Sequence, residues 1–323
     1  MRCPMTGAAE AFVAGRFFFV YGGVGKSRYG AIDVGTNSVR LLIASREGEQ
    51  VVPLHREMET TRIGAGTRAT GRLSPAGAAR TLAVLRRYRG VLAAWQVGRA
   101  RAVATSAVRE ASNGAEFAVR ASRVLGFPLE VIGGREEAYL SYQGAARGLP
   151  GVERPLVVDI GGGSTELTWL RDGQLQAHSL PLGAVGVTEN PSLLDLLDDY
   201  QPLLAELAEQ RGITLVGVGG TATTLAAIEQ GMTVYDPQRV QGYPLERAAV
   251  ERIWRRLAGL PLAERRQVAG LQPARADIIL AGIRILLEIM RRTGRDRLIV
   301  GESDLLYGMV WELSEGQRGG GAS

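Results

Sequence analysis

Asp159-Ile160-Gly161-Gly162-Gly163-Ser164-Thr165-Glu166 is the stretch that decides the fold of this chain, because an earlier stretch repeats its pattern. At 31–42 the chain reads Ala-Ile-Asp33-Val-Gly-Thr-Asn-Ser-Val-Arg-Leu-Leu. Both copies run from an apolar strand through Asp, one apolar residue, Gly and a small polar turn into a second apolar strand. Glycine allows the turn a positive φ and lets a ligand approach bare backbone. Two such turns, one in each half, predict two domains that face each other across a phosphate group.

The two turns supply residues that we expect to contact phosphate, since consecutive N–H groups in such a turn form a concave anion site. The expected contacts are Thr36, Asn37 and Ser38 in the first turn and Gly161, Gly162, Gly163, Ser164 and Thr165 in the second. Asp33 and Asp159 each end a strand, where a carboxylate can hold a metal ion or its water beside the anion. A plain β-hairpin explains either turn alone, but it does not explain the repeat with the same flanking strands.

A third glycine-rich turn lies at 216–225, between a predicted strand and a predicted helix. It contributes Gly219, Gly220 and Thr221, with Thr221 as the expected N-cap. Helix N-termini carry open N–H groups and partial positive charge, so they favour anions. A tight turn that needs glycine only for packing explains this segment equally well from its residues alone.

Composition narrows the class of protein. A chain of 323 residues is long enough for two domains, and no apolar run reaches the roughly 20 residues of a membrane span. Cys3 is the only cysteine, which excludes a disulfide framework and a thiolate metal site and favours the cytoplasm. Lys26 is the only lysine, so the net charge of +5 rests on arginine, which binds phosphate oxygens bidentately. This balance fits a polyanionic substrate, and no signature of a nucleic-acid-binding fold is present.

Histidine is almost absent, which limits the available chemistry. His55 and His178 are the only two, and their separation fits no metal-ligand spacing. Serine–histidine and cysteine–histidine catalysis are therefore disfavoured, and we expect any general base to be a carboxylate. Glu136 and Glu137 begin a predicted helix; since adjacent residues point in different directions, at most one of them should reach the ligand.

Residues 1–27 do not share the pattern that follows. The segment 22–27 resembles a P-loop, but Val20 stands where that motif needs glycine, and a strand follows where it needs a helix. We therefore expect an extension outside the fold.

The remaining chain predicts the same order of elements twice: three strands, a helix, a strand and a helix. Strands are expected at 29–34, 39–45, 50–57, 100–104, 129–132, 155–160, 165–171, 174–181, 213–218 and 296–300, with helices at 74–94, 113–125, 135–147, 191–210, from 221, and at 245–257, 274–292 and 303–314. Ser74-Pro75 is a good N-cap and N1 pair, and Asp172-Gly173 is a strong hairpin turn. The fold class is α/β, with domain I at 28–147, domain II at 148–300, helix 301–315 packing back on domain I, and a disordered tail at 316–323.

The repeated order resembles the ribonuclease-H-like unit of the actin/Hsp70/sugar-kinase superfamily, whose ligands bind in the cleft between two such domains. Six ordered motifs resemble, more specifically, the Ppx/GppA exopolyphosphatase and guanosine pentaphosphatase family in a short, two-domain form. These motifs are Asp33-Val-Gly-Thr-Asn-Ser38, Ala104-Thr-Ser-Ala-Val-Arg-Glu110, Gly134-Arg-Glu-Glu-Ala138, Val158-Asp-Ile-Gly-Gly-Gly-Ser-Thr-Glu166, Leu180-Pro-Leu-Gly-Ala184 and Gly217-Val-Gly-Gly-Thr-Ala-Thr-Thr224.

The resemblance implies hydrolysis of a terminal phosphoanhydride bond with Mg²⁺ or Mn²⁺, in inorganic polyphosphate or guanosine pentaphosphate. It implies Glu137 as the base for water, Arg109 as a phosphate contact, and Asp159 and Glu166 as residues linked to metal and water. Many relatives have arginine where this chain has Gly186, so one basic contact is absent. A homodimer is left open. An ATP-dependent kinase of the same superfamily is a further alternative, but this chain has no recognisable sugar-binding insert. A non-catalytic phosphate sensor would not need the three carboxylates.

Overall fold

The computed structural model describes residues 9–13, 16–20 and 27–315, which form two compact units. Unit 1 runs through residue 133 and resumes at residue 306, and unit 2 spans 134–305. The strands of unit 1 are β1 (Ala9–Val13), β2 (Arg16–Val20), β3 (Arg28–Val34), β4 (Ser38–Glu47), β5 (Gln50–Thr60), β6 (Arg99–Ala104) and β7 (Leu129–Val131). Its helices are α1 (Thr67–Thr70), α2 (Pro75–Ala94), α3 (Ser106–Glu110), α4 (Gly114–Leu125) and nearly all of α13 (Leu305–Glu315).

Unit 2 holds the remaining elements. Its strands are β8 (Pro155–Ile160), β9 (Thr165–Arg171), β10 (Gln174–Leu180), β11 (Thr214–Val218), β12 (Pro244–Glu246) and β13 (Arg297–Val300). Its helices are α5 (Gly134–Gly148), α6 (Ala184–Glu189), η1 (Pro191–Asp198), α7 (Gln201–Glu209), α8 (Gly219–Glu229), α9 (Pro237–Val240), α10 (Arg247–Ala258), α11 (Leu262–Arg265), η2 (Pro273–Arg275) and α12 (Ile279–Arg292).

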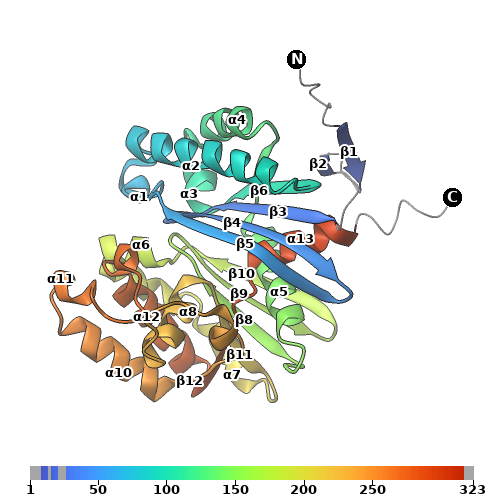
Figure 1. The fold of residues 1–323 in the computed structure, drawn as a ribbon. Coiled ribbons are helices and arrows are strands. Elements are labelled where there is room, and N and C mark those ends of the chain that lie inside the picture. The colour runs from blue at the N-terminus through green and yellow to red at the C-terminus, as the bar shows by residue number, and fades with distance from the viewer. Residues whose placement is uncertain (1–8, 14–15, 21–26, 316–323) are drawn as a thin grey trace, which may run out of the picture. The chain divides into compact units, whose positions relative to one another are not determined.

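The two sheets share one strand order, and most of their strands are labelled in Figure 1. In unit 1 the central order is β5-β4-β3-β6 with β7 beyond, and in unit 2 it is β10-β9-β8-β11-β13. Strands β3, β4 and β5 of unit 1 pair antiparallel, as do β8, β9 and β10 of unit 2. The next strand in each unit, β6 or β11, pairs parallel with β3 or β8. The predicted α/β fold with two ribonuclease-H-like units is therefore confirmed.

Each sheet is covered on both faces within its own unit. In unit 1, α2 and α4 bury an apolar face of the sheet against residues such as Leu85 and Phe117. The other face meets α13 through arginines: Arg101, fully buried, pairs with Glu312 at 2.7 Å, and the Arg46 guanidinium lies 3.9 Å from the Trp311 ring centroid. Breaking a buried pair of this kind typically costs about 3–5 kcal/mol, so α13 is an integral part of unit 1.

In unit 2, helices α7, α8, α10 and α12 pack on one face of the sheet. Helix α5 packs on the other face, through Tyr142, Ala145 and neighbouring residues. Val158 and Leu167 point into the core beneath α7, α8, α10 and α12. Because successive strand residues point to opposite faces, their immediate neighbours in the strands must point toward α5. Those residues include Asp159 and Glu166.

Of the three predicted helix caps and turns considered next, two are confirmed and one is wrong. Ser74 caps α2 by accepting a bond from Gly77 N at 3.1 Å, and Asp172 and Gly173 both have positive φ, so these two predictions are confirmed. The prediction of Thr221 as N-cap is wrong: α8 begins at Gly219 and its N-cap is Val218. A glycine with φ of 75° starts the helix three residues earlier than an N-cap at Thr221 would.

The N-terminal segment also differs from expectation. We predicted residues 1–27 to lie outside the fold, yet β1 and β2 form a hairpin, and β2 pairs with β6 at Ala100 and Arg99. The pairing is available because β7 covers only 102–104 of that strand edge. The P-loop-like segment 22–26, Cys3 and the predicted tail 316–323 lie outside the described residues.

The compact units divide the chain between Gly133 and Gly134, whereas the sequence places the domain boundary after residue 147. The difference is helix α5, which packs on strands β8, β9 and β10 and so belongs with unit 2. Across the described ranges, no helix combines the length and the apolar character that crossing a bilayer requires.

Candidate functional site

A row of polar side chains crosses three strands of unit 2 on the face that α5 covers. Asp159 of β8 is paired in register with Glu166 of β9, and Glu166 is paired with Ser179 of β10. Directly opposed residues project from the same face with Cβ atoms roughly 4.5–5.5 Å apart. The Ser179 hydroxyl donates to Glu166 Oε1 at 2.7 Å. The register therefore places two carboxylates side by side.

Helix α5 adds a third carboxylate and a second hydroxyl to this row. Glu137 and Ser141 are four residues apart and thus lie on one side of the helix. Ser141 Oγ donates to Asp159 Oδ2 at 2.7 Å, and Glu137 is buried, whereas its neighbour Glu136 is only half-buried. Gly134 sets the approach of the helix, because a Cβ there would lie 2.6 Å from the Ser179 Cβ.

The three carboxylates repel one another in a dry environment. Glu166 is only 2% exposed, and burial raises its pKa well above the ordinary value. The charges of Glu137 and Asp159 raise that pKa further, and hydrogen bonds from Ser179 and Ser164 oppose the rise only in part. The cluster therefore has an excess of negative charge that protons or a cation would relieve.

We expect this excess to appear in the pH dependence of stability. The pKa of Glu166 is higher in the folded protein than its unfolded value of about 4.3, so the folded state binds more protons. Proton binding by Glu166 therefore stabilises the folded state fully at low pH, and this stabilisation is lost as pH rises through the folded pKa. In EDTA, Glu166→Gln should gain stability relative to the wild type between pH 5 and pH 8. Thermal unfolding of both proteins tests this; parallel pH profiles would contradict it.

The third glycine turn meets the acidic cluster at Asp159. A Cβ on Gly219 would lie 2.5 Å from Asp159 Oδ1, and φ of 75° independently favours glycine at this position. The carboxylate thus lies at the N-terminus of α8, where open N–H groups and the helix dipole favour negative charge. Gly220 is closer still to Arg275, whose Nη1 would be 1.5 Å from a Cβ there. A guanidinium group therefore covers the first turn of this helix.

The first residues of α6 support the second glycine turn through backbone hydrogen bonds. Ala184 N donates to the Gly161 carbonyl at 2.9 Å, and Val185 N donates to the Gly162 carbonyl at 2.8 Å. In a planar trans peptide the next N–H points opposite to the carbonyl, so the N–H groups of Gly162 and Gly163 point away from α6. This is the orientation that an anion-binding turn requires.

Gly183 makes that support possible, and its replacement should be costly. Its φ is −138°, so alanine meets no backbone strain, but a Cβ would lie 2.5 Å from the Gly162 backbone. We expect Gly183→Ala to lower kcat/KM for the phosphorylated substrate by roughly 10²-fold, the scale of a 1 Å misplacement. Gly270→Ala is a control for general destabilisation, because its Cβ would meet the Ala227 backbone at 2.4 Å, away from the turn, and its φ of 84° adds backbone strain. Equal losses of activity in both variants would contradict a positioning role.

The first turn, in unit 1, has the same construction. Gly35 N bonds to the Ser38 carbonyl at 3.0 Å, as Gly161 N bonds to the Ser164 carbonyl at 2.9 Å. Gly64 N donates to the Thr36 carbonyl at 2.9 Å, which directs the Asn37 N–H away from residues 62–64. The side chains of Thr36, Asn37 and Ser38 are all buried.

The two turns differ at the residue that is paired with the aspartate. Arg40 occupies the register position opposite Asp33 that Glu166 occupies opposite Asp159. Its Nη2 lies 2.8 Å from Asp33 Oδ2. The charge of Asp33 is thus matched by protein, which makes it a poorer metal ligand than the carboxylates of unit 2. Arg109, on α3, donates to the Ile132 carbonyl at 3.0 Å.

The donor set of unit 2 fits a hard divalent cation. Asp159 and Glu166 offer adjacent carboxylate oxygens, and neither is paired across the sheet with a His or Cys. Positive charge would relieve the repulsion between the two carboxylates. Within the described ranges, no group of three or more His, Cys, Asp or Glu residues is arranged to hold a metal ion. Mg²⁺ nevertheless commonly uses one or two carboxylates together with substrate phosphates and water. Asp159 and Glu166 are therefore the residues that would hold Mg²⁺ or Mn²⁺.

Comparison with known proteins identifies the family that shares this construction. The sequence profile of the Ppx/GppA phosphatase family matches residues 42–315. The chain belongs to the Ppx/GppA phosphatase family. It is 36% identical over 316 residues to Exopolyphosphatase 2 of Mycobacterium tuberculosis, covering 89% of this chain and 99% of that protein.

Solved structures from this family agree in fold. The Aquifex aeolicus member is 33% identical with a TM-score of 0.73, covering 92% of this chain and 99% of its own. An exopolyphosphatase from Cytophaga hutchinsonii is 26% identical with a TM-score of 0.81, covering 90% and 98%. Members of the family are phosphatases, so the chain is an enzyme of the hydrolase class.

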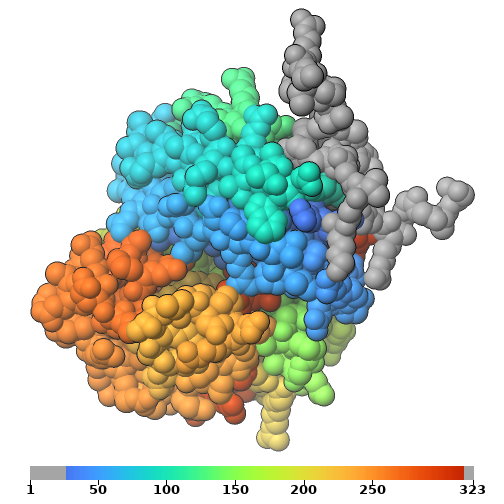
Figure 2. All heavy atoms as spheres, viewed as in Figure 1, coloured from blue at the N-terminus to red at the C-terminus, as the bar shows by residue number. Residues whose placement is uncertain are grey.

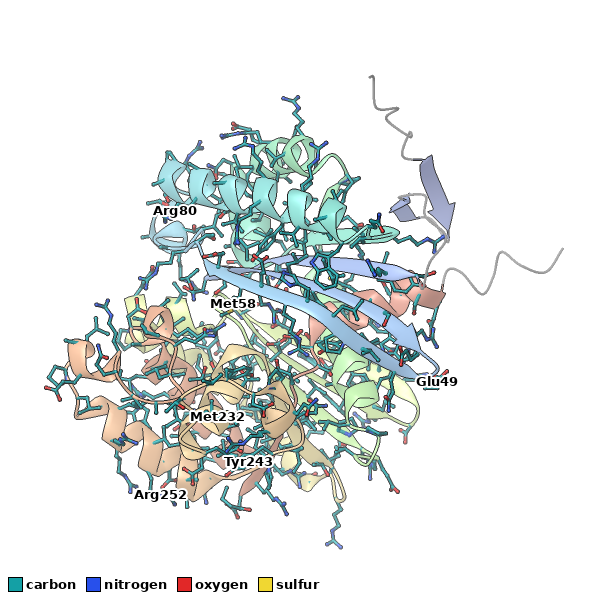
Figure 3. The ribbon with its side chains drawn as sticks, viewed as in Figure 1. Glu49, Met58, Arg80, Met232, Tyr243 and Arg252 are labelled. Atoms are coloured by element: carbon teal, nitrogen blue, oxygen red, sulfur yellow. The ribbon has the colours of Figure 1, made fainter. Side chains whose placement is uncertain are left out.

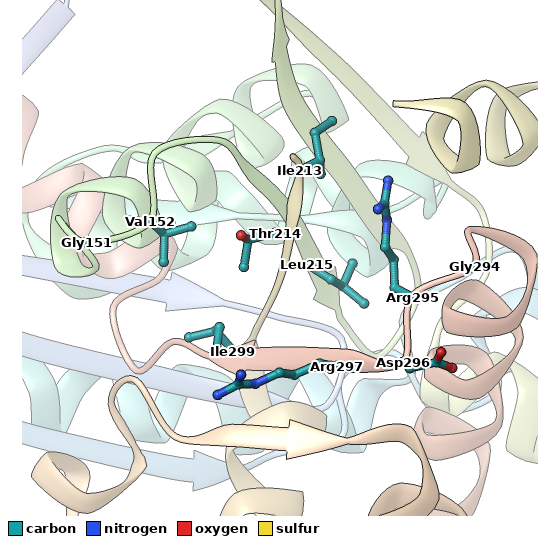
Figure 4. Close-up of a pocket in the computed structure, with 10 residues that line it drawn as sticks. All are labelled: Gly151, Val152, Ile213, Thr214, Leu215, Gly294, Arg295, Asp296, Arg297 and Ile299. Carbon is teal, nitrogen blue, oxygen red and sulfur yellow. The ribbon is translucent and has the colours of Figure 1, made fainter. Parts of the chain in front are cut away.

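A pocket of about 540 Å³ lies elsewhere in unit 2 (Figure 4). Its lining comes from 151–152, 213–215 and 294–297, with Ile299, and these segments mostly precede or begin strands β11 and β13. Ligands of sheets with parallel strands bind beyond the carboxyl ends of those strands, where Gly219 lies. We therefore assign no part of the phosphate chemistry to this pocket.

Three residues of the site were not predicted from the sequence. Ser141 and Ser179 bond the carboxylates, and Arg275 covers Gly220. The two serines could have been found from spacing, since Ser141 is one helical turn after Glu137 and Ser179 faces Glu166 across the Asp172-Gly173 hairpin. Arg275 offers no such signal, because it lies 55 positions after Gly220 in a 3₁₀ turn.

Proposed function

We propose that this chain releases terminal orthophosphate from inorganic polyphosphate by hydrolysis in the cytoplasm. The observation that carries the proposal is the cluster of Glu137, Asp159 and Glu166 next to a turn whose N–H groups are directed away from their support. Phosphoryl transfer chiefly requires positioning and neutralisation of charge around an aligned nucleophile. The cluster and the turn supply both within one unit, in a family of phosphatases.

In this proposal Glu137 accepts the proton of the attacking water. It is buried and has no competing histidine. His178 is paired with Leu167 and so points to the opposite face of the sheet from Ser179 and Glu166, and His55 lies on β5 of unit 1. Within unit 2, turn amides at Gly162 and Gly163 hold the transferred phosphoryl group, and the Arg275 guanidinium binds phosphate oxygens. The Arg109 guanidinium of unit 1 is proposed separately as a phosphate contact. Mg²⁺ at Asp159 and Glu166 would supply further positive charge to the phosphate oxygens and the leaving group.

Polyphosphate is favoured as the substrate over guanosine pentaphosphate. Two of the three relatives compared above carry the name exopolyphosphatase, and the chain has a net charge of +5. A linear polyanion can contact many arginines at once, whereas a nucleotide engages few. The family name includes both activities, so the two substrates must be compared directly.

The test is phosphate release by the purified protein from long-chain polyphosphate, tripolyphosphate, guanosine pentaphosphate and ATP, each with Mg²⁺. We expect the highest kcat/KM for long-chain polyphosphate and a KM that falls with chain length. A higher kcat/KM for guanosine pentaphosphate, with no length dependence for polyphosphate, would replace the proposed substrate. Absence of phosphate release from all four would refute the proposed reaction.

A further inference from the structure

The positive charge of this chain is concentrated in one segment. Residues 61–129 contain twelve arginines and only two acidic residues, Glu110 and Glu116, so they carry +10. The rest of the chain, with 26 basic and 31 acidic residues, carries −5. A general preference for arginine over lysine explains the residue type but not this segregation, since both parts use arginine. The whole net charge of the protein therefore depends on one part of unit 1.

The structure places much of this charge on an outer helical layer. Helices α2 and α4 pack against each other and cover one face of the unit 1 sheet (Figure 1). Helix α2 has no acidic residue, and α4 has only Glu116. Arg86 and Arg89 on α2 and Arg120 and Arg123 on α4 are all exposed. Residues three apart lie on one side of a helix, so each helix presents a pair of arginines outward.

We call these four residues the α2–α4 arginines. Within the described part of the chain, none of the four forms an ion pair with a carboxylate, whereas Arg87, beside them on α2, pairs with Glu57 and Glu59. Arg89 also joins the helices, because its Nη1 donates to the Val124 carbonyl at 3.4 Å and its guanidinium lies along Gly126. Blue-tipped side chains project from the outer faces of both helices in Figure 3, and Figure 2 shows this layer at the molecular surface.

Another arginine of unit 1, Arg109, lies on a helix that adjoins α4. Helix α3, which carries Arg109, packs directly on α4: a Cβ on Gly114 would lie 1.9 Å from the Val108 carbonyl oxygen. Arg109 is a proposed phosphate contact, so basic residues on three packed helices of unit 1 share a proposed role in binding phosphate. Unbalanced guanidinium groups in a row attract a polyanion through release of its counterions.

We propose that the α2–α4 arginines form a second binding surface for the distal part of a long polyphosphate chain. The inference rests on the proposed polyphosphate substrate and adds the source of preference for long chains. A linear chain with a charge on every phosphate can contact both arginine pairs, but a compact anion engages one or two groups. Tripolyphosphate, in contrast, is expected to engage the second glycine turn and Arg275 of unit 2, which both variants described below leave unchanged.

Polyphosphate fits this surface better than single-stranded nucleic acid does. Proteins that bind single strands place aromatic side chains where bases can stack. The aromatic residues of these helices, Tyr88 and Phe117, are 0% and 3% exposed and belong to the core. The surface thus offers charge without stacking platforms, which suits a polyanion that has no bases.

The test compares two quadruple variants of the full chain. Arg86, Arg89, Arg120 and Arg123 are changed to glutamine in one; the control changes Arg211, Arg256, Arg266 and Arg284, exposed arginines of unit 2, and so has the same net charge. Binding of long-chain polyphosphate is measured at several salt concentrations, separately from turnover. Because the first variant has four fewer guanidinium groups to bind phosphate, the slope of log K against log salt should fall by about 3, and affinity at low salt by roughly tenfold or more. Turnover of tripolyphosphate should match that of the control.

Each outcome decides between alternatives. Equal affinities and salt slopes in the two quadruple variants would overturn the second surface, whether or not the enzyme hydrolyses polyphosphate. Wild-type protein that binds polyphosphate through this surface but hydrolyses none would instead refute the proposed function. A single-stranded RNA of equal charge is the competitor; if it binds more tightly than polyphosphate and loses that binding only in the α2–α4 variant, the polyphosphate assignment is overturned. If the quadruple variant is unstable, a double variant of Arg86 and Arg120 repeats the test. It leaves Arg89 and its hydrogen bond to Val124 in place.

Discussion

Replacing Glu137 by glutamine is expected to lower turnover of polyphosphate by roughly 10²–10⁴-fold, the range for loss of a general base. Glutamine keeps the size of the side chain and its burial in α5 but cannot accept the proton of water. Removing one of three mutually repelling carboxylates should also leave the fold intact or more stable. Initial rates and equilibrium binding of polyphosphate, measured on the same preparation, separate turnover from affinity.

Glu136→Gln is the matched control, since it makes the same chemical change one position earlier on a half-buried side chain. It should keep turnover within a few-fold of the wild type, because adjacent helix residues point in different directions. Near wild-type turnover of Glu137→Gln, with binding unchanged, would remove Glu137 from the mechanism. Equal losses in both variants would point to damage of the helix start.

The second large effect is expected from Asp159→Asn. Asparagine can still accept the bond from Ser141 and fit beside Gly219, but it loses the negative charge that would hold the cation. Loss of residues that merely orient metal ligands already costs 10–100-fold, so loss of a ligand should raise the Mg²⁺ concentration for half-maximal activity by at least roughly 100-fold. Titration of activity with Mg²⁺, with and without EDTA, measures this requirement.

Asp172→Asn provides the control for that substitution. Asp172 lies in the exposed hairpin turn of the same sheet, with φ of 50°, a conformation that asparagine adopts readily. Its Mg²⁺ requirement should equal that of the wild type. Full wild-type activity in excess EDTA would contradict a metal requirement, and an unchanged Mg²⁺ titration of Asp159→Asn would place the cation elsewhere.

The repeat around Asp33 and Asp159 carried most of what the sequence could predict. Strand pairs that flank a four-residue turn are local, so pattern and turn chemistry fix them, and the bonds Gly35 N to Ser38 O and Gly161 N to Ser164 O show that the repeat is structural. Register then follows from the turn, which is why Asp159 and Glu166 could be expected to lie together. The fold class followed from repeating this unit with its helices.

What the sequence did not predict depends on contacts between distant segments. The support of the second turn by Ala184 and Val185, and the position of Arg275 over Gly220, join segments that no local pattern relates. The start of α8 was misplaced because a hydroxyl suggests an N-cap, while a glycine with positive φ let the helix begin earlier. The pairing of β2 with β6 was missed because an edge left open by a short strand is visible only in three dimensions.

The central claim, attack of water on the terminal phosphorus of polyphosphate, is tested most directly with ¹⁸O-labelled water. Long-chain polyphosphate, Mg²⁺ and the purified protein are incubated, and the released orthophosphate is analysed by mass. We predict one solvent oxygen in each orthophosphate, because the bond from the terminal phosphorus to the bridging oxygen breaks and that oxygen stays with the shortened chain. Orthophosphate without label, or no orthophosphate at all, would contradict the account.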